Sequence, residues 1–148
     1  MIDSTALASE ITADPLGLGY AAQIAIGSDT GIAALLNATT GPGAAQVTLP
    51  GMSRDAFLSA CLPGVIALAG LNGTIQAKWD RLLGVAQAAD SITAANIAAV
   101  LSMAVTDGVL TSQQAAAIGV RTGSRAEVLF GAGTVVGASD VSMALRGK

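Results

Sequence analysis

Residues 74–89 read TIQAKWDRLLGVAQAA and contain the clearest helical pattern of the chain. Most polar side chains of this segment fall on one side, and the apolar ones recur at the spacing of one face of an α-helix. These apolar positions are Ile75, Trp79, Leu82, Leu83 and Ala86. The segment therefore predicts an amphipathic helix whose core anchor is Trp79.

Weaker helical patterns lie on both sides of this segment. A hydroxyl or carboxylate before an apolar run is typical of a helix start, because it accepts a hydrogen bond from a free amide of the first turn. Thr111 with Gln114, and Ser124 with Glu127, have the spacing of capping boxes that open two short helices. Further helices are expected near residues 4–13, 28–37, 53–61, 93–105 and 139–145. The chain is thus predicted to be all-α, with residues 1–148 forming one compact domain, a bundle of about six to eight short helices.

One segment interrupts the helical pattern. Residues 39–52 contain Gly-Pro-Gly at positions 41–43 and Pro-Gly at positions 50–51, and a residue that precedes proline disfavours the helical conformation. Val47 and Leu49 alternate with polar neighbours, which also allows a short edge strand. We expect an extended arm or loop here, bounded by glycine and proline, that clasps a neighbouring copy.

The composition is apolar and poor in charge. Of the 148 residues, 52% are hydrophobic and 11% are charged, whereas an average soluble domain has roughly 25% charged residues. Many of the apolar residues are alanine, which stabilises a core much less than Leu or Phe does. The helix at 93–105, which is built largely of small residues, is expected to be buried on more than one face. We therefore expect other copies of the chain to cover its helices.

The charged residues are unevenly distributed. Residues 1–120 hold three basic and eight acidic side chains, a net charge of −5, while residues 121–148 hold four basic and two acidic side chains, a net charge of +2. Arg121, Arg125 and Arg146 are therefore candidates for docking on an acidic surface, including the N-terminal half of another copy. The overall net charge of −3 argues against binding duplex DNA through its phosphates. No sequence-specific nucleic-acid partner is expected.

No assembled catalytic or metal-binding motif is present in the sequence. The chain has no histidine, which removes histidine-based nucleophile pairs and most zinc sites. The acidic residues are scattered singly, and the glycines at 131–137 lack the spacing of a dinucleotide-binding loop. The only cysteine, Cys61, has apolar neighbours and is expected to be a buried thiol. We expect no enzyme, cofactor or metal, and the alternative in this class is an enzyme that uses carboxylates or Tyr20 at a subunit interface.

The larger side chains are the candidates for core or assembly contacts. A large apolar or aromatic side chain removes much more surface from water than alanine does, so it contributes most of the hydrophobic free energy. These candidates are Tyr20, Phe57, Trp79, Leu83, Leu101 and Phe130.

Four short segments spread over most of the chain form a further pattern. They are DPLGLGY at 14–20, Ser-Arg-x-x-Phe-Leu at 53–58, the helix around Trp79, and SRAE at 124–127. Together they resemble a family of small proteins encoded among the structural genes of tailed bacteriophages. The chain departs from that family by its richness in Ala and Gly and by the arm at 41–50. The resemblance implies a virion or assembly protein and supplies no catalytic residues.

These observations predict a non-enzymatic structural component of a tailed-phage virion, assembled in the host cytoplasm. We expect an oligomeric tail or head-tail protein whose partners are copies of itself and other phage structural proteins. One alternative is a capsid decoration protein. Another is a membrane-active protein delivered during infection, which the uncharged segments 56–77 and 91–106 motivate. Pro-Gly at 63–64 and Asn-Gly at 72–73 interrupt the first of these segments, which disfavours a membrane-spanning helix.

Overall fold

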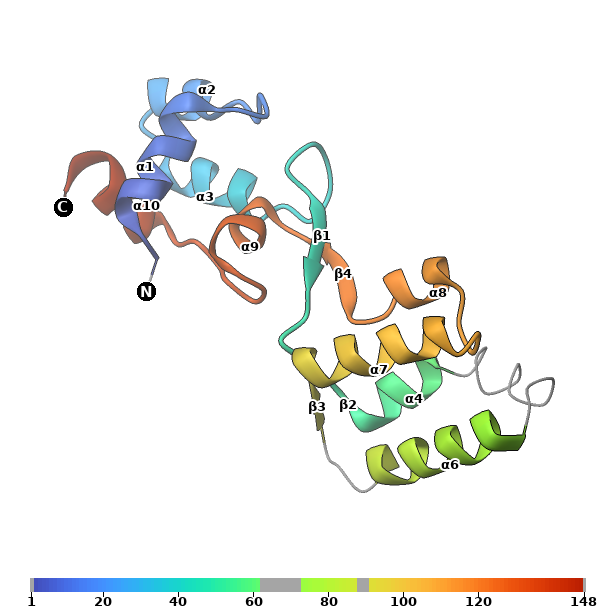
Figure 1. The fold of residues 1–148 in the computed structure, drawn as a ribbon. Helices are drawn as coiled ribbons and strands as arrows, with labels where there is room; N and C mark the ends of the chain where they lie inside the picture. The colour runs from blue at the N-terminus through green and yellow to red at the C-terminus, as the bar shows by residue number, and fades with distance from the viewer. Residues whose placement is uncertain (1, 62–72, 88–90, 148) are drawn as a thin grey trace. The chain divides into compact units, whose positions relative to one another are not determined.

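The computed structural model describes residues 2–61, 73–87 and 91–147, without the side chains of residues 82, 83 and 85–87. This part of the chain forms nine helices and two small antiparallel sheets with four strands in total (Figure 1), so the prediction of an all-α fold is wrong. The chain packs as two compact units, unit 1 (Met1–Val47 and Thr122–Lys148) and unit 2 (Thr48–Arg121). The expectation of a single domain stays a prediction, and each unit is described by itself.

Unit 1 is helical and takes its helices from both ends of the chain. Helix α1 packs on α10, and α3 packs on α2, α9 and α10. The bounds are α1 Ser4–Ala13, α2 Tyr20–Ala25, α3 Asp29–Asn37, α9 Arg125–Phe130 and α10 Ala138–Arg146. The buried core consists of Leu7, Ile11, Tyr20, Ile32, Ala33, Leu36, Ala126, Val136 and Val141. The two ends of the sequence therefore form one core.

The helix starts of unit 1 follow the local sequence. The Asp3 carboxylate accepts hydrogen bonds from the amides of Thr5 at 2.9 Å and Ala6 at 3.1 Å, so the predicted helix at 4–13 is confirmed. The capping box of Ser124 and Glu127 is also confirmed, because each side chain accepts a hydrogen bond from the other's amide. Helix α10 begins at Ala138, one residue before the expected position 139. Its N-cap residue is Gly137, whose amide donates a hydrogen bond to Asp140 Oδ2 at 2.8 Å.

Unit 2 contains a two-stranded sheet in which each strand leads directly into a helix. Its elements are β2 Gly51–Ser53, α4 Arg54–Ala60, α6 Gly73–Gln87, β3 Ser91–Thr93, α7 Ala94–Thr106 and α8 Ser112–Ala116. The Ser53 hydroxyl caps α4 and the Thr93 hydroxyl caps α7, each accepting a hydrogen bond at 3.3 Å from an amide three residues later. Strands β2 and β3 are antiparallel, and Met52 lies opposite Ile92 at the centre. Strand β2 thus leads into α4 and strand β3 into α7 from a shared pair of strands.

The core of unit 2 lies between these elements. Its buried residues are Phe57, Cys61, Trp79, Ile92, Ile97, Ala104, Val109, Leu110 and Ile118. The predicted helices around Trp79 and at 93–105 are confirmed as α6 and α7, and the Thr111 capping box opens α8 as expected. Within the single chain, α7 buries Ile97 and Ala104 and leaves Ala95, Ala98 and Ala99 exposed, so its burial on more than one face is not met inside the chain and, against other copies, stays a prediction.

The expected arm at 39–52 is partly extended, as predicted, but its strands pair within the chain. Strand β1, Ala45–Thr48, pairs with β4, Val120–Gly123, and β2 pairs with β3. The alternation in β1 is as expected, since Val47 is buried between the exposed side chains of Gln46 and Thr48. A Cβ atom at Gly123 would lie 2.6 Å from Val47, so glycine is required for this close approach.

Candidate functional site

One carboxylate organises the loop that follows α1. Asp14 adopts a φ of 40°, a left-handed conformation that is uncommon for a residue other than glycine. Its carboxylate accepts hydrogen bonds from the amides of Leu18 at 2.6 Å, Gly19 at 2.9 Å and Tyr20 at 3.3 Å. Burial acts to raise the pKa of Asp14, but the backbone amide donors outweigh it and hold the pKa below its ordinary value. The DPLGLGY segment is therefore an ordered turn that places Tyr20 at the start of α2.

A buried ion pair joins α1 to α9. Arg125 Nε donates to Glu10 Oε1 at 2.8 Å, and Arg125 Nη2 donates to Glu10 Oε2 at 2.7 Å. The Glu10 side chain is 5% exposed and that of Arg125 is 17% exposed. The hydrogen bonds to Glu10 raise the pKa of Arg125 although burial opposes the change. Because Ser124 fixes the first turn of α9, the SRAE segment holds Arg125 in place for this bidentate contact.

Tyr20 is fully buried beside this ion pair. Burial and then the charges of Glu10 and Asp14 raise the pKa of Tyr20 above its ordinary value. Its hydroxyl is close enough to Glu10 to be affected by that carboxylate, yet it forms no hydrogen bond of normal geometry with any residue that the structure describes. A neutral phenol sealed in a core cannot meet a substrate. Tyr20 is therefore a core residue of unit 1, and its hydroxyl is not accessible in the chain by itself.

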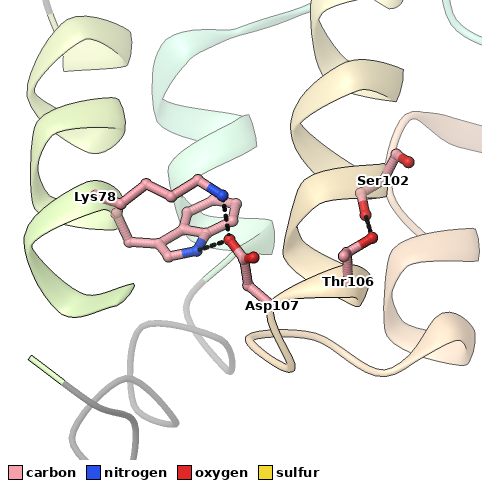
Figure 2. Close-up of polar contacts among 5 residues, drawn as sticks. Lys78, Ser102, Thr106 and Asp107 are labelled. Atoms are coloured by element: carbon pink, nitrogen blue, oxygen red, sulfur yellow. Dashed lines mark hydrogen bonds and ion pairs between the residues drawn. The ribbon is translucent and has the colours of Figure 1, made fainter. Parts of the chain in front are cut away.

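A second polar cluster fastens α6 to the end of α7 in unit 2. Asp107, the C-cap residue of α7, accepts hydrogen bonds from Lys78 Nζ at 2.5 Å and from Trp79 Nε1 at 3.1 Å (Figure 2). Trp79 is 4% exposed, so its indole N–H needs a partner, and Asp107 supplies it. The hydrogen bond from Lys78 lowers the pKa of Asp107, burial opposes it, and the Trp79 bond lowers it further. Figure 2 also shows the Thr106 hydroxyl, which donates to the Ser102 carbonyl at 2.9 Å within the last turn of α7.

An open groove of about 620 Å³ lies along the first turns of α6. It is lined by Gly73, Thr74, Ala77, Lys78, Arg81 and Met103. Its volume falls within the usual range of small-molecule sites, but the Lys78 charge is matched by Asp107. Within residues 2–61, 73–87 and 91–147, the one buried side-chain polar atom that lacks a partner is the Tyr20 hydroxyl of unit 1. The groove therefore has no unsatisfied buried group to recognise a ligand.

Several large hydrophobic side chains are exposed on unit 1. All seven large hydrophobic side chains that are exposed in the described part of the chain belong to this unit. They are Leu16, Ile24, Ile26, Val128, Leu129, Val135 and Met143. A single exposed apolar residue is ordinary, whereas several large ones on the described part of unit 1 are a feature of surfaces that contact other molecules.

The charged side chains of unit 1 are engaged inside the unit. Each one that the structure describes forms an ion pair or accepts a hydrogen bond from a backbone amide there. They are Asp3, Glu10, Asp14, Asp29, Arg125, Glu127, Asp140 and Arg146. In unit 2, Asp80 and Arg81 are exposed and have no partner among the described residues. Among the described charges, these two of unit 2 are therefore the ones that remain available to solvent or to another molecule.

The candidate residues from the sequence lie in different surroundings. Tyr20, Phe57 and Trp79 are buried, and Leu101 and Phe130 are partly buried against the cores. The side chain of Leu83 lies outside the described residues.

The candidate docking charges are also placed by the structure. Arg125 pairs with Glu10 and Arg146 pairs with Asp29, so both bind the acidic N-terminal half of their own chain. Arg121 is exposed in β4. The complementary charges of the two ends of the sequence thus pair with each other within unit 1. Sequence reasoning missed the role of Asp107, for which no local signal exists.

Two features were looked for in the described residues, a cluster of metal-binding side chains and a membrane-spanning helix. No group of three or more carboxylate or thiol side chains comes together there as a potential metal site. No helix in the same residues combines the length and apolar character needed to cross a bilayer. Comparison of the chain with models of protein families, with curated proteins and with solved structures found no match.

Proposed function

We propose that this protein is a non-enzymatic structural subunit of a larger assembly, namely an oligomeric tail or head-tail component of a tailed-phage particle. The observation that carries the proposal is the surface of unit 1, where large hydrophobic side chains are exposed and the described charges are engaged internally. Such a surface is poorly solvated on an isolated molecule and is suited to contacts with other subunits. Its partners in this proposal are copies of the chain and other structural proteins.

The residues of the phage-like segments support a structural role. Asp14 orders the loop before α2, Tyr20 fills the core, and Arg125 clamps α9 to α1. Glu127 closes the capping box and also accepts the Gly133 amide at 2.7 Å. Each of these polar groups has a role in the fold, so none of them needs a catalytic role to explain its presence.

The experiment that tests the proposal is quantitative mass spectrometry of purified phage particles and of their assembly intermediates. A fixed copy number per particle that withstands a high-salt wash would support a structural subunit, because apolar contacts are not weakened by salt. Absence of the chain from particles and from intermediates would contradict the proposal. Cryo-electron microscopy of the same particles would then distinguish tail from head-tail position.

A further inference from the structure

The C-terminal segment of unit 1, residues 122–147, is held in place by the N-terminal segment, residues 2–47. Helix α9 packs on α3, and α10 packs on both α1 and α3, whereas α9 and α10 have little contact with each other. Helices of six and nine residues are too short to be stable alone in water. The C-terminal segment therefore folds by docking onto the N-terminal segment, as a separate peptide ligand would.

Apolar contacts and hydrogen bonds join the two segments. Ala126, Val136 and Val141 of the C-terminal segment are buried in the shared core. The Asn37 side-chain amide donates to the Val136 carbonyl at 2.7 Å and accepts from the Val136 amide at 3.0 Å. The N-terminal segment thus satisfies backbone groups of the C-terminal segment as well as covering its apolar side chains.

The two segments also have complementary charges. Residues 2–47 contain four acidic side chains and no lysine or arginine. Arg125 of the C-terminal segment pairs with Glu10. Arg146 pairs with Asp29. Contact between two N-terminal segments would bring like charges together, whereas an N-terminal and a C-terminal segment bring opposite charges together. The surface of the N-terminal segment is therefore specific for a C-terminal segment of this sequence.

We propose that copies of this chain exchange their C-terminal segments, so that residues 122–147 of one copy complete unit 1 of another. Every contact described above is then kept, because both copies have the same sequence. Exchange of identical elements is for this reason a low-cost route to association. The occupant of the N-terminal segment is the one that the structure shows, supplied by a second copy. This inference rests on the proposed oligomeric function and adds the contact that joins the copies.

The chain offers a place where its path can change. The buried core of unit 2, which runs from Phe57 to Ile118 in the sequence, includes no residue of either segment. The chain continues from Ile118 to β4 through Gly119, whose φ is 78°. Glycine adopts positive and negative φ about equally well. The backbone can therefore change direction at Gly119, with β4 moving together with the C-terminal segment, while the core of unit 2 stays intact.

Concentration decides which copy supplies the segment. Within one molecule the connection through unit 2 keeps the two segments at an effective concentration on the order of 1 mM. A dilute chain therefore keeps its own C-terminal segment. Copies packed side by side in an assembly reach comparable local concentrations, so that exchange between them competes.

The test uses two full-length variants that each reverse one charge. Glu10→Arg places two basic side chains against each other, and Arg125→Glu places two acidic ones against each other. Exchange between identical copies leaves this repulsion in place, whereas exchange between the two variants restores opposite charges at both contacts. In native mass spectrometry with one variant isotopically labelled, the mixture should form about tenfold or more mixed dimer than either variant forms of its own dimer.

The matched control is the double variant Glu10→Arg with Arg125→Glu, in which opposite charges meet within one chain. It should stay monomeric and should form no mixed dimer with the wild type. Because Glu10 is buried, a second pair of variants at a more exposed contact, Asp29→Arg and Arg146→Asp, repeats the experiment. Absence of a mixed dimer with both pairs of variants would overturn the inference, and so would variants that dimerise alone as well as in the mixture.

Hydrogen exchange of the labelled variant locates the contact. In Arg125→Glu alone the α10 amides should exchange faster than in the wild type, and addition of Glu10→Arg should restore their protection. A mixed dimer in which α10 stays unprotected overturns the inference, because the copies then meet elsewhere. A chain that exchanges its segment but is absent from particles refutes the proposed function and leaves the inference standing. A chain that is present in particles but forms no mixed dimer does the reverse.

Discussion

The Glu10 carboxylate and the Arg125 guanidinium form a bidentate ion pair although 115 residues separate them in the sequence. Replacement of Arg125 by Met is expected to lower the free energy of unfolding by about 3–5 kcal/mol, because Glu10 then stays buried without its counter-charge. Hydrogen exchange of the α1 and α9 amides as a function of urea concentration measures this loss in unit 1. The double variant Glu10→Leu with Arg125→Met should recover most of it. A single variant as stable as the wild type would show that the pair does not hold the unit together.

Tyr20 predicts a loss of stability at alkaline pH. The folded state raises the pKa of this phenol above its ordinary value of 10.0, so the unfolded chain releases the proton first. The resulting stabilisation is complete below pH 10 and is lost as the pH rises toward the folded pKa. Tyr20→Phe should lack this alkaline loss and should change stability at neutral pH by no more than about 0.5 kcal/mol, because the hydroxyl forms no regular hydrogen bond. Tyrosinate absorbance of the folded protein checks the assignment, and ionisation near the ordinary pKa would refute it.

Asp107 predicts a loss of stability in acid. Its pKa is lower in the folded state than its ordinary value of 3.8, so the unfolded carboxylate is protonated first as the pH falls. The stabilisation is therefore present above pH 3.8 and disappears as the pH falls through the folded value. Asp107→Asn should be less stable at neutral pH and less sensitive to acid. Fluorescence of Trp79, the only tryptophan, follows unfolding of unit 2.

The matched control for this experiment is Asp80→Asn. Asp80 is exposed on the same helix as Trp79 and has no partner among the residues described. Its substitution should leave both the stability and the acid dependence of unit 2 unchanged. An equal effect of the two substitutions would mean that the net charge, not the contact between Asp107 and Trp79, controls the acid transition.

Replacement by alanine is expected to change the stability of unit 2 in opposite directions at two glycines. A Cβ atom at Gly51 would lie 2.7 Å from the Ile92 carbonyl oxygen, so Gly51→Ala must displace β2 from β3. We expect a loss of about 1–3 kcal/mol. Gly84 lies inside α6, and a methyl group added there would meet no atom within 4 Å, so Gly84→Ala should add about 0.5–1 kcal/mol because alanine favours helix. Thermal unfolding followed by Trp79 fluorescence distinguishes the two signs.

Features that depend on nearby residues were predictable from the sequence. The start of α1 at Ser4 and the two capping boxes depend on side chains within three residues of the amides they bind. Strands β3 and β4 were missed because each has only three or four residues and pairs with a strand far away in the sequence. Ser53 and Thr93 begin two of the predicted helical segments, but in the structure each is also the last residue of a strand.

The polar clusters were predictable only in part. The sequence indicated that the basic C-terminal segment complements the acidic N-terminal half, and the pairs of Arg125 and Arg146 have this character. It did not indicate that both partners belong to the same chain. Asp107 is the C-cap residue of α7, but its contacts with Lys78 and Trp79 cross 28 or more residues. Such contacts depend on tertiary packing, which no local pattern encodes.

Unit 1 is formed by both ends of the sequence, so it cannot be completed until translation has finished. Helices α1 to α3 leave the ribosome first, but Ala126, Val136 and Val141, which complete their core, leave it last. Unit 2 is contiguous in sequence, so its core residues are all synthesised before the end of the chain. A nascent chain that ends before α10 leaves the apolar faces of α1 and α3 without part of their core. Chaperones and proteases recognise such exposed apolar surface.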